Sequence, residues 1–259
     1  MWPLRVKSIL EPDEEEWQIE TWRWLIYERG GHEDIQESPL VCPTGSFFPA
    51  SEAKGAQLAQ HVFEHVKMHA RMQDWPCELI EQPDTGGLTV NPVTALKVRK
   101  ASPAGTFMHD GNAAQISYSP SLLKDRVALV STLAHELAHY LIGHPKRMPP
   151  GGGSGLEPAT DLTVAYLGFG IFGANSAFQY QQHQDFMSQG WGYSRLGYIK
   201  EREWVFALAI FLALKGLDAS SAKPHLKPHL ANQLKRVEKY LQLNPAILER
   251  IKSPSSQDQ

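Results

Sequence analysis

Residues 125–145 have the sequence DRVALVSTLAHELAHYLIGHP, and this stretch decides both the fold and the chemistry that we expect. Apolar side chains recur through it at intervals of three and four residues, which predicts a buried helix. Asp125 stands before the first apolar residue and can cap the helix, while Gly143 and Pro145 end the pattern. The stretch therefore predicts one well-delimited helix in the middle of the chain.

This helix carries two histidines four residues apart, His135 and His139, with Glu136 directly after the first. Positions i and i+4 lie one above the other on a helix, so both imidazoles can bind one metal ion. The carboxylate of Glu136 can then reach a water on that metal and act as general base. Chance alone would give an HExxH sequence in roughly a few per cent of chains this size, so the motif needs support from elsewhere.

The support lies downstream, where Glu157 follows His139 by 18 positions and Asp161 comes four residues later. The segment 149–155, PPGGGSG, can turn the chain back, and an apolar helical pattern begins at Glu157. A second helix could thus supply Glu157 as third ligand, while Asp161 accepts the N–H of a ligating histidine. Asp161 as third ligand is the alternative. Two histidines, one carboxylate and a water form an open catalytic zinc site.

HExxH followed by Glu-x-x-x-Asp resembles the gluzincin metallopeptidases, the thermolysin-like group. Residues 116–120, ISYSP, are also similar to the compact ImmA/IrrE-type metallopeptidases, whose active helix follows a short edge strand. The resemblance covers about residues 104–172 and departs at Leu156, where the thermolysin pattern usually has Asn. It implies a Zn²⁺ ion as cofactor, a base and a supporting carboxylate, provided by His135, His139 and Glu157 as ligands, Glu136 as base and Asp161 as support.

We expect an α+β, zincin-like fold with a small mixed sheet, an active-site helix and a mainly helical C-terminal half. Aromatic and alternating runs at residues 4–10 and 17–27 predict a β-rich N-terminal segment over 1–50. The metallopeptidase domain is expected over 51–252, and a disordered tail over 253–259.

Within that domain, residues 51 to about 73 predict a helix, and residues 201–214 and 231–243 predict two more. Short strands are expected at residues 77–81, 88–90, 95–98, 106–109 and 115–118. The turn sequence DGN at 110–112 joins the last two as a hairpin. The final hairpin strand could border the cleft and pair with an extended substrate, or it could be an ordinary sheet strand.

Residues 61–65, HVFEH, match the inverted metallopeptidase motif H-x-x-E-H, and His69 extends the same helical face. The inverted motif needs a distant glutamate of its own, and no downstream helix supplies one independently of the first site. A polar, partly exposed helix face is the favoured interpretation.

Hydrolysis also needs a hydrogen-bond donor beside the oxyanion that develops opposite the metal. Four side chains downstream of the ligand helix are candidates: His183, Tyr193, Arg195 and Tyr198. We place His183 and Tyr198 with Glu136 in the expected catalytic set.

The composition excludes several classes of protein. The chain has 259 residues and a net charge of −3, with no basic excess for nucleic acid. It has two cysteines, too few for a disulfide framework, and its first residues lack a secretory pattern, so a cytoplasmic location is expected. The apolar stretches 162–182 and 204–214 are interrupted or too short to span a bilayer, which predicts no membrane association.

Zinc-dependent hydrolysis of a peptide or protein substrate is therefore the first hypothesis. A zincin-like regulatory or interaction module that binds metal without hydrolysis is the second. A globular protein without metal, in which HExxH is coincidental, is the third. An intact Glu136 favours the first hypothesis, because a purely structural site does not need this carboxylate.

Overall fold

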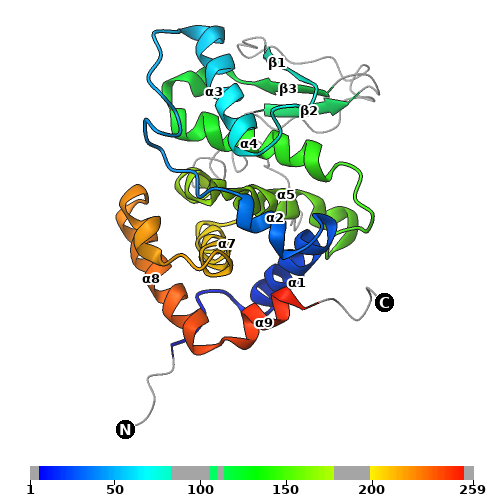
Figure 1. The fold of residues 1–259 in the computed structure, drawn as a ribbon, viewed down its shortest axis with the longest axis vertical. Helices are drawn as coiled ribbons and strands as arrows, with labels where there is room; N and C mark the ends of the chain where they lie inside the picture. Colours follow the sequence, from blue (N-terminus) through cyan, green and yellow to red (C-terminus); the bar gives the residue numbers. More distant parts are fainter. Residues whose placement is uncertain (1–5, 83–104, 110–113, 178–198, 254–259) are drawn as a thin grey trace, which may run out of the picture.

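The computed structural model describes residues 6–82, 105–109, 114–177 and 199–253 (Figure 1). The fold is mixed α+β, mostly helical with a small three-stranded sheet. The longer elements along the chain are α1 (Pro12–Glu28), α2 (His32–Glu37), α3 (Gly55–His69), β1 (Cys77–Glu81), β2 (Gly105–His109), β3 (Ala114–Tyr118), α4 (Arg126–Ile142), α5 (Leu156–Val164), α7 (Glu201–Leu214), α8 (Pro228–Leu243) and α9 (Ala246–Lys252). Short 3₁₀ turns are η2 (Pro120–Lys124), η3 (Gly152–Gly155), η5 (Ala219–Ser221) and η6 (Lys223–His225).

Helix α4 occupies the middle of the molecule, with the sheet on one side and α5 on the other (Figure 1). The predicted cap is confirmed, since the Asp125 carboxylate accepts the N–H groups of Val127 and Ala128, each at 3.0 Å. Most of the helix is buried. An apolar helix between two layers fixes the direction of every side chain on it, including the histidines.

The sheet has the strand order β1-β3-β2, with β1 parallel and β2 antiparallel to β3. The strands expected at 77–81, 106–109 and 115–118 are confirmed to within one residue. Of the two alternatives for the final hairpin strand, the structure shows the ordinary sheet strand: β3 is the central strand, so its hydrogen-bonding groups already pair on both sides and cannot bind an extended substrate. Residues 88–90, 95–98 and the turn 110–112 lie outside the described residues.

The expectation of a β-rich N-terminal segment is wrong. Residues 17–27 belong to helix α1, and the described residues 6–50 contain no strand. Pro12 occupies the first helical position, and the Glu14 carboxylate accepts the N–H of Glu11 at 3.1 Å. Of the aromatic residues that suggested a strand, Trp22 and Trp24 are buried in the same core as α4 and α7, and Trp17 packs against that core.

Helix α1 also packs against the last helix, α9. The guanidinium of Arg250 on α9 forms ion pairs with the carboxylates of Glu16 and Glu20 on α1. Elements from both ends of the described chain therefore lie side by side (Figure 1).

The three other predicted helices are present, whereas α2 and α9 were not predicted. The apolar helix at 201–214 is confirmed as α7, α3 begins at Gly55 rather than at Ser51, and α8 begins three residues before the predicted start. The predicted tail lies outside the described residues from 254 onward. In the described part of the chain no single helix is long and apolar enough to cross a membrane, and only the bent pair α7 and 219–225 together passes that test of length and composition.

Candidate metal centre

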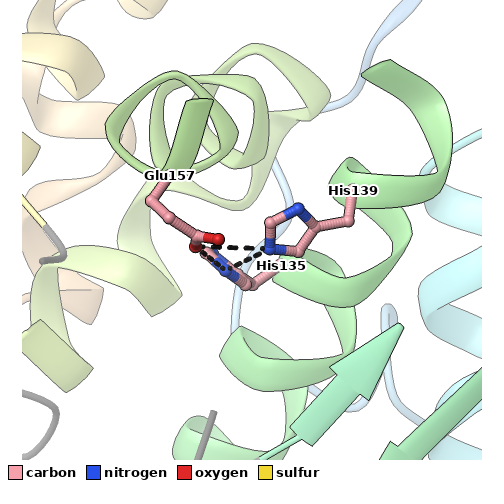
Figure 2. Close-up of side chains that lie close together, drawn as sticks. All are labelled: His135, His139 and Glu157. Atoms are coloured by element: carbon pink, nitrogen blue, oxygen red, sulfur yellow. Dashed lines mark hydrogen bonds and ion pairs between the residues drawn. The ribbon is translucent and has the colours of Figure 1, made fainter. Parts of the chain in front are cut away.

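The two histidines of α4 point to the same place beside the helix. His135 and His139 lie one turn apart, and their Nε2 atoms are 3.0 Å apart (Figure 2). The side chain of His135 is 7% exposed and that of His139 is 25% exposed, so the outer face of the pair is open to solvent. The four-residue spacing in HExxH thus brings the two Nε2 atoms close together, as predicted.

Helix α5 brings Glu157 to the same point (Figure 2). Its Oε2 atom is 3.4 Å from Nε2 of His139 and 3.6 Å from Nε2 of His135. Because α5 begins at Leu156, the carboxylate stands in the first helical turn, where the helix dipole favours negative charge. The Glu157 side chain is 48% exposed, which leaves the centre accessible.

These three ligand atoms fit a tetrahedral metal ion. Zinc binds nitrogen and oxygen ligands at about 2.0–2.1 Å, so two ligand atoms of a tetrahedron lie about 3.4 Å apart. The observed separations are 3.0, 3.4 and 3.6 Å. His135, His139 and Glu157 form a group that could hold a metal ion, and within the described ranges no other set of histidine, cysteine and acidic residues does so.

The histidines of the inverted motif on α3 have other partners. Nδ1 of His65 donates to the carbonyl oxygen of His61 at 2.8 Å, and Nε2 of His69 donates to that of Phe47 at 2.8 Å. These histidines and Glu64 are not among the groups that could hold a metal. This observation agrees with the favoured interpretation of a polar helix face.

Asp161 orients His135 from behind. Its Oδ1 atom accepts the Nδ1–H of His135 at 2.9 Å, and its Oδ2 atom accepts the backbone N–H of Ile199 at 2.9 Å. With the proton on Nδ1, the lone pair on Nε2 of His135 faces Glu157. The carboxylate of Asp161 is 2% exposed and contacts the nitrogen opposite to the one that faces Glu157.

Thr160 gives a similar but longer contact to His139. Its hydroxyl donates to the carbonyl oxygen of Leu156 at 2.8 Å and lies 3.4 Å from Nδ1 of His139. This residue was not predicted from the sequence. Its position three residues after Glu157, on the same face of α5, is the signal that could have identified it.

Glu136 follows His135 on α4 and is 2% exposed. The backbone of Gly105 on β2 approaches it so closely that a Cβ atom there would stand 2.9 Å from Oε1 of Glu136. Burial raises the pKa of this carboxyl group above its usual value. Strand β2 and helix α4 thus enclose the carboxylate in a site from which water is largely excluded.

The charges of the cluster favour a cation at its centre. Burial lowers the pKa of His135, but the carboxylates of Asp161 and Glu157 raise it more, to about 10. Burial raises the pKa of Glu157, and the imidazoles of His135 and His139 lower it more, so that the net shift is downward. A positive charge beside Nε2 of His135, from a proton or a metal ion, is therefore stabilised.

The candidates for oxyanion stabilisation, His183, Tyr193, Arg195 and Tyr198, lie outside the described residues. The next residue, Ile199, is described and buried, and its N–H binds Asp161. No side-chain donor for an oxyanion is assigned among the described residues.

No protein-family model, no curated protein and no solved structure matches the chain. A functional proposal therefore has to rest on the geometry of the candidate metal centre.

Proposed function

We propose that this protein is a zinc-dependent metallopeptidase. His135, His139 and Glu157 hold the zinc ion, and Glu136 is the general base. The observation that carries the proposal is the convergence of three ligand atoms at tetrahedral spacing, with a buried carboxylate next to the first ligand on the same helix.

When bound, zinc supplies Lewis acidity, which acidifies water and polarises a carbonyl group. Glu136 takes the proton from the attacking water and delivers it to the leaving amine. Asp161 holds His135 in the tautomer whose Nε2 is free to bind metal. Gly105 and the surrounding core exclude bulk water from the carboxylate of Glu136.

The expected substrate is a peptide or protein. The half-exposed side chain of Glu157 and the partly exposed ring of His139 support this, because they leave the metal accessible from solvent. His183 or Tyr198 remains the predicted donor to the oxyanion.

The test compares wild type with Glu136→Gln, which keeps the size of the side chain and removes the base. Both proteins, purified without a metal-binding tag, should contain about one zinc per chain. Hydrolysis of a random peptide mixture should fall by about 10²–10⁴-fold in Glu136→Gln. Glu33→Gln makes the same change at an exposed carboxylate on α2 and should behave as wild type.

Full activity of Glu136→Gln would exclude the proposed mechanism. Zinc binding without any hydrolysis by the wild type would instead favour the non-hydrolytic regulatory or interaction module. A wild type without stoichiometric metal would exclude both.

A further inference from the structure

The chain that connects α4 to α5 leads directly to the third ligand. It spans residues 143–155, is rich in glycine and proline, and is largely exposed. A segment of this composition has little core of its own, so its path depends on what holds it. Glu157 is the second residue of α5, immediately beyond this connection.

Two indole groups of α1 hold the connection. Nε1–H of Trp24 donates to the carbonyl oxygen of Arg147 at 2.8 Å, and Nε1–H of Trp17 donates to that of Pro150 at 3.1 Å. These contacts join residues more than 120 positions apart in sequence. They fix backbone atoms rather than side chains, which determines the path of the chain itself.

A carboxylate of the same helix holds the same stretch. The two oxygens of Glu28 accept the backbone N–H groups of Lys146 and Arg147 at 2.9 and 3.0 Å. The guanidinium of Arg147 also lies over the ring of Tyr27, 4.7 Å from its centroid. Trp17, Trp24 and Glu28 are spaced by seven and four residues, so they share one face of α1. We call these three residues the α1 clasp.

Close backbone contacts hold the chain between the α1 clasp and Glu157. The N–H of Gly152 donates to the carbonyl oxygen of Pro149 at 2.9 Å. A Cβ atom at Gly155 would stand 2.2 Å from the carbonyl oxygen of Pro150, so these two backbones are in direct contact. A shift of the clasped backbone is therefore transmitted to the start of α5.

We propose that Trp17, Trp24 and Glu28 are positioning residues for the third metal ligand. They set where Glu157 lies relative to His135 and His139, although none of them belongs to the ligand group. The inference rests on the proposed metal site. A ligand must be held to within about 0.5 Å of its working position, and the α1 clasp provides that constraint for the half-exposed Glu157.

The test measures zinc affinity of the full chain by competition with a chromophoric chelator. Trp24→Phe keeps an aromatic side chain and removes the donor to the carbonyl oxygen of Arg147, and Glu28→Ala removes both acceptors. Each should raise the zinc Kd by about 10-fold or more, the lower range seen for groups that orient a ligand. The absorption band of the Co²⁺-loaded variants should shift, because loss of a ligand changes the coordination geometry.

Trp22→Phe is the matched control. Trp22 is fully buried on the same helix, and in the described structure its Nε1 has no hydrogen-bond partner. This variant should lower the Tm of the metal-free protein and leave the zinc Kd and the Co²⁺ spectrum unchanged. Trp17→Phe, which loses one contact at 3.1 Å, is the milder variant if the others do not fold.

The inference is overturned if variants of the α1 clasp lower the Tm but keep the wild-type Kd and Co²⁺ spectrum. The inference does not depend on hydrolysis. A wild type that binds zinc but is inactive would exclude the proposed peptidase function, and the zinc Kd values of the variants could still be compared. A wild type without zinc affinity would exclude the inference together with the metal site.

Discussion

Gly105 stands against the carboxylate of Glu136, the proposed general base, with no room for a side chain. A Cβ atom there would lie 2.8 Å from the carbonyl oxygen of Ser117, 2.8 Å from Cγ2 of Thr132 and 2.9 Å from Oε1 of Glu136. The contact with the Ser117 backbone cannot relax easily, whereas the contact with Glu136 can be relieved by a shift of its flexible carboxylate. We expect Gly105→Ala to lower kcat/KM by at least about 10-fold, because a displaced base loses much of its contribution.

The zinc content per chain of Gly105→Ala should equal that of the wild type, since the proposed ligand atoms lie on α4 and α5. Gly45→Ala is the control, because a Cβ atom at Gly45 meets nothing within 4 Å. The test measures kcat/KM and zinc content of the two variants. An unchanged kcat/KM in Gly105→Ala would contradict the expected displacement of the Glu136 carboxylate.

Asp161 accepts hydrogen bonds from two different donors, the Nδ1–H of His135 and the N–H of Ile199. Asp161→Asn replaces one acceptor oxygen with an amide that donates, so one of these contacts must be lost. We expect the zinc Kd to rise by about 10–100-fold. Asp74→Asn, at an exposed position in the turn between α3 and β1, should leave the Kd unchanged. An unaltered Kd in Asp161→Asn would show that this carboxylate does not orient the ligand.

The contacts of the site differ in how far the sequence could predict them. His135 and His139 follow from helical spacing, and Glu157 and Asp161 follow from their separation downstream. The roles of Gly105 and Ile199 could not be predicted, because a backbone contact made by a distant residue leaves no side-chain pattern. Their positions depend on the tertiary packing of β2 and of the chain before α7.

At the scale of the element, the N-terminus of α4 offers a direct test of stability. Asp125→Ala removes the acceptor of two backbone N–H groups. We expect the free energy of unfolding to fall by about 0.5–2 kcal/mol, measured by urea denaturation of the metal-free protein. Asp125→Asn retains an acceptor and should lose less. Equal stability of Asp125→Ala and wild type would contradict the capping role.

The secondary structure shows where local patterns succeed and where they fail. Helix α4 was predicted because its cap, apolar period and terminating residues agree with one another. Helix α1 was misassigned because its tryptophans suggested a strand, although Pro12 and the acidic first turn are signals of a helix start. Burial of Trp22 against the core outweighs its local β-propensity.

Strand order was not predictable for a different reason. The hairpin of β2 and β3 is local, and its two arms were identified from sequence. The parallel pairing of β1 with β3 joins residues 77–81 to residues 114–118. Local sequence does not encode that pairing, so the central position of β3 emerged only in the folded chain.

At the scale of the whole molecule, the metal should stabilise the fold by mass action. A ligand that binds only the folded state adds about 2.7 kcal/mol when its free concentration is 100 times Kd. For a chain of this size each kcal/mol raises Tm by about 2–4 °C, so zinc should raise it by about 5–10 °C. Thermal unfolding across a zinc titration measures the shift. The same shift in Glu157→Ala would mean that zinc stabilises the protein at another place.

The contact between α1 and α9 can form only late in the synthesis of the protein, because α9 is made long after α1. At about 5–20 residues per second, α1 leaves the ribosome some tens of seconds before its partner is made. The proposed ligands His135, His139 and Glu157 and the carboxylate of Asp161 all emerge earlier than α9. We therefore expect the nascent chain to gather its ligands first and to fix their final spacing only when the last helix closes over the first.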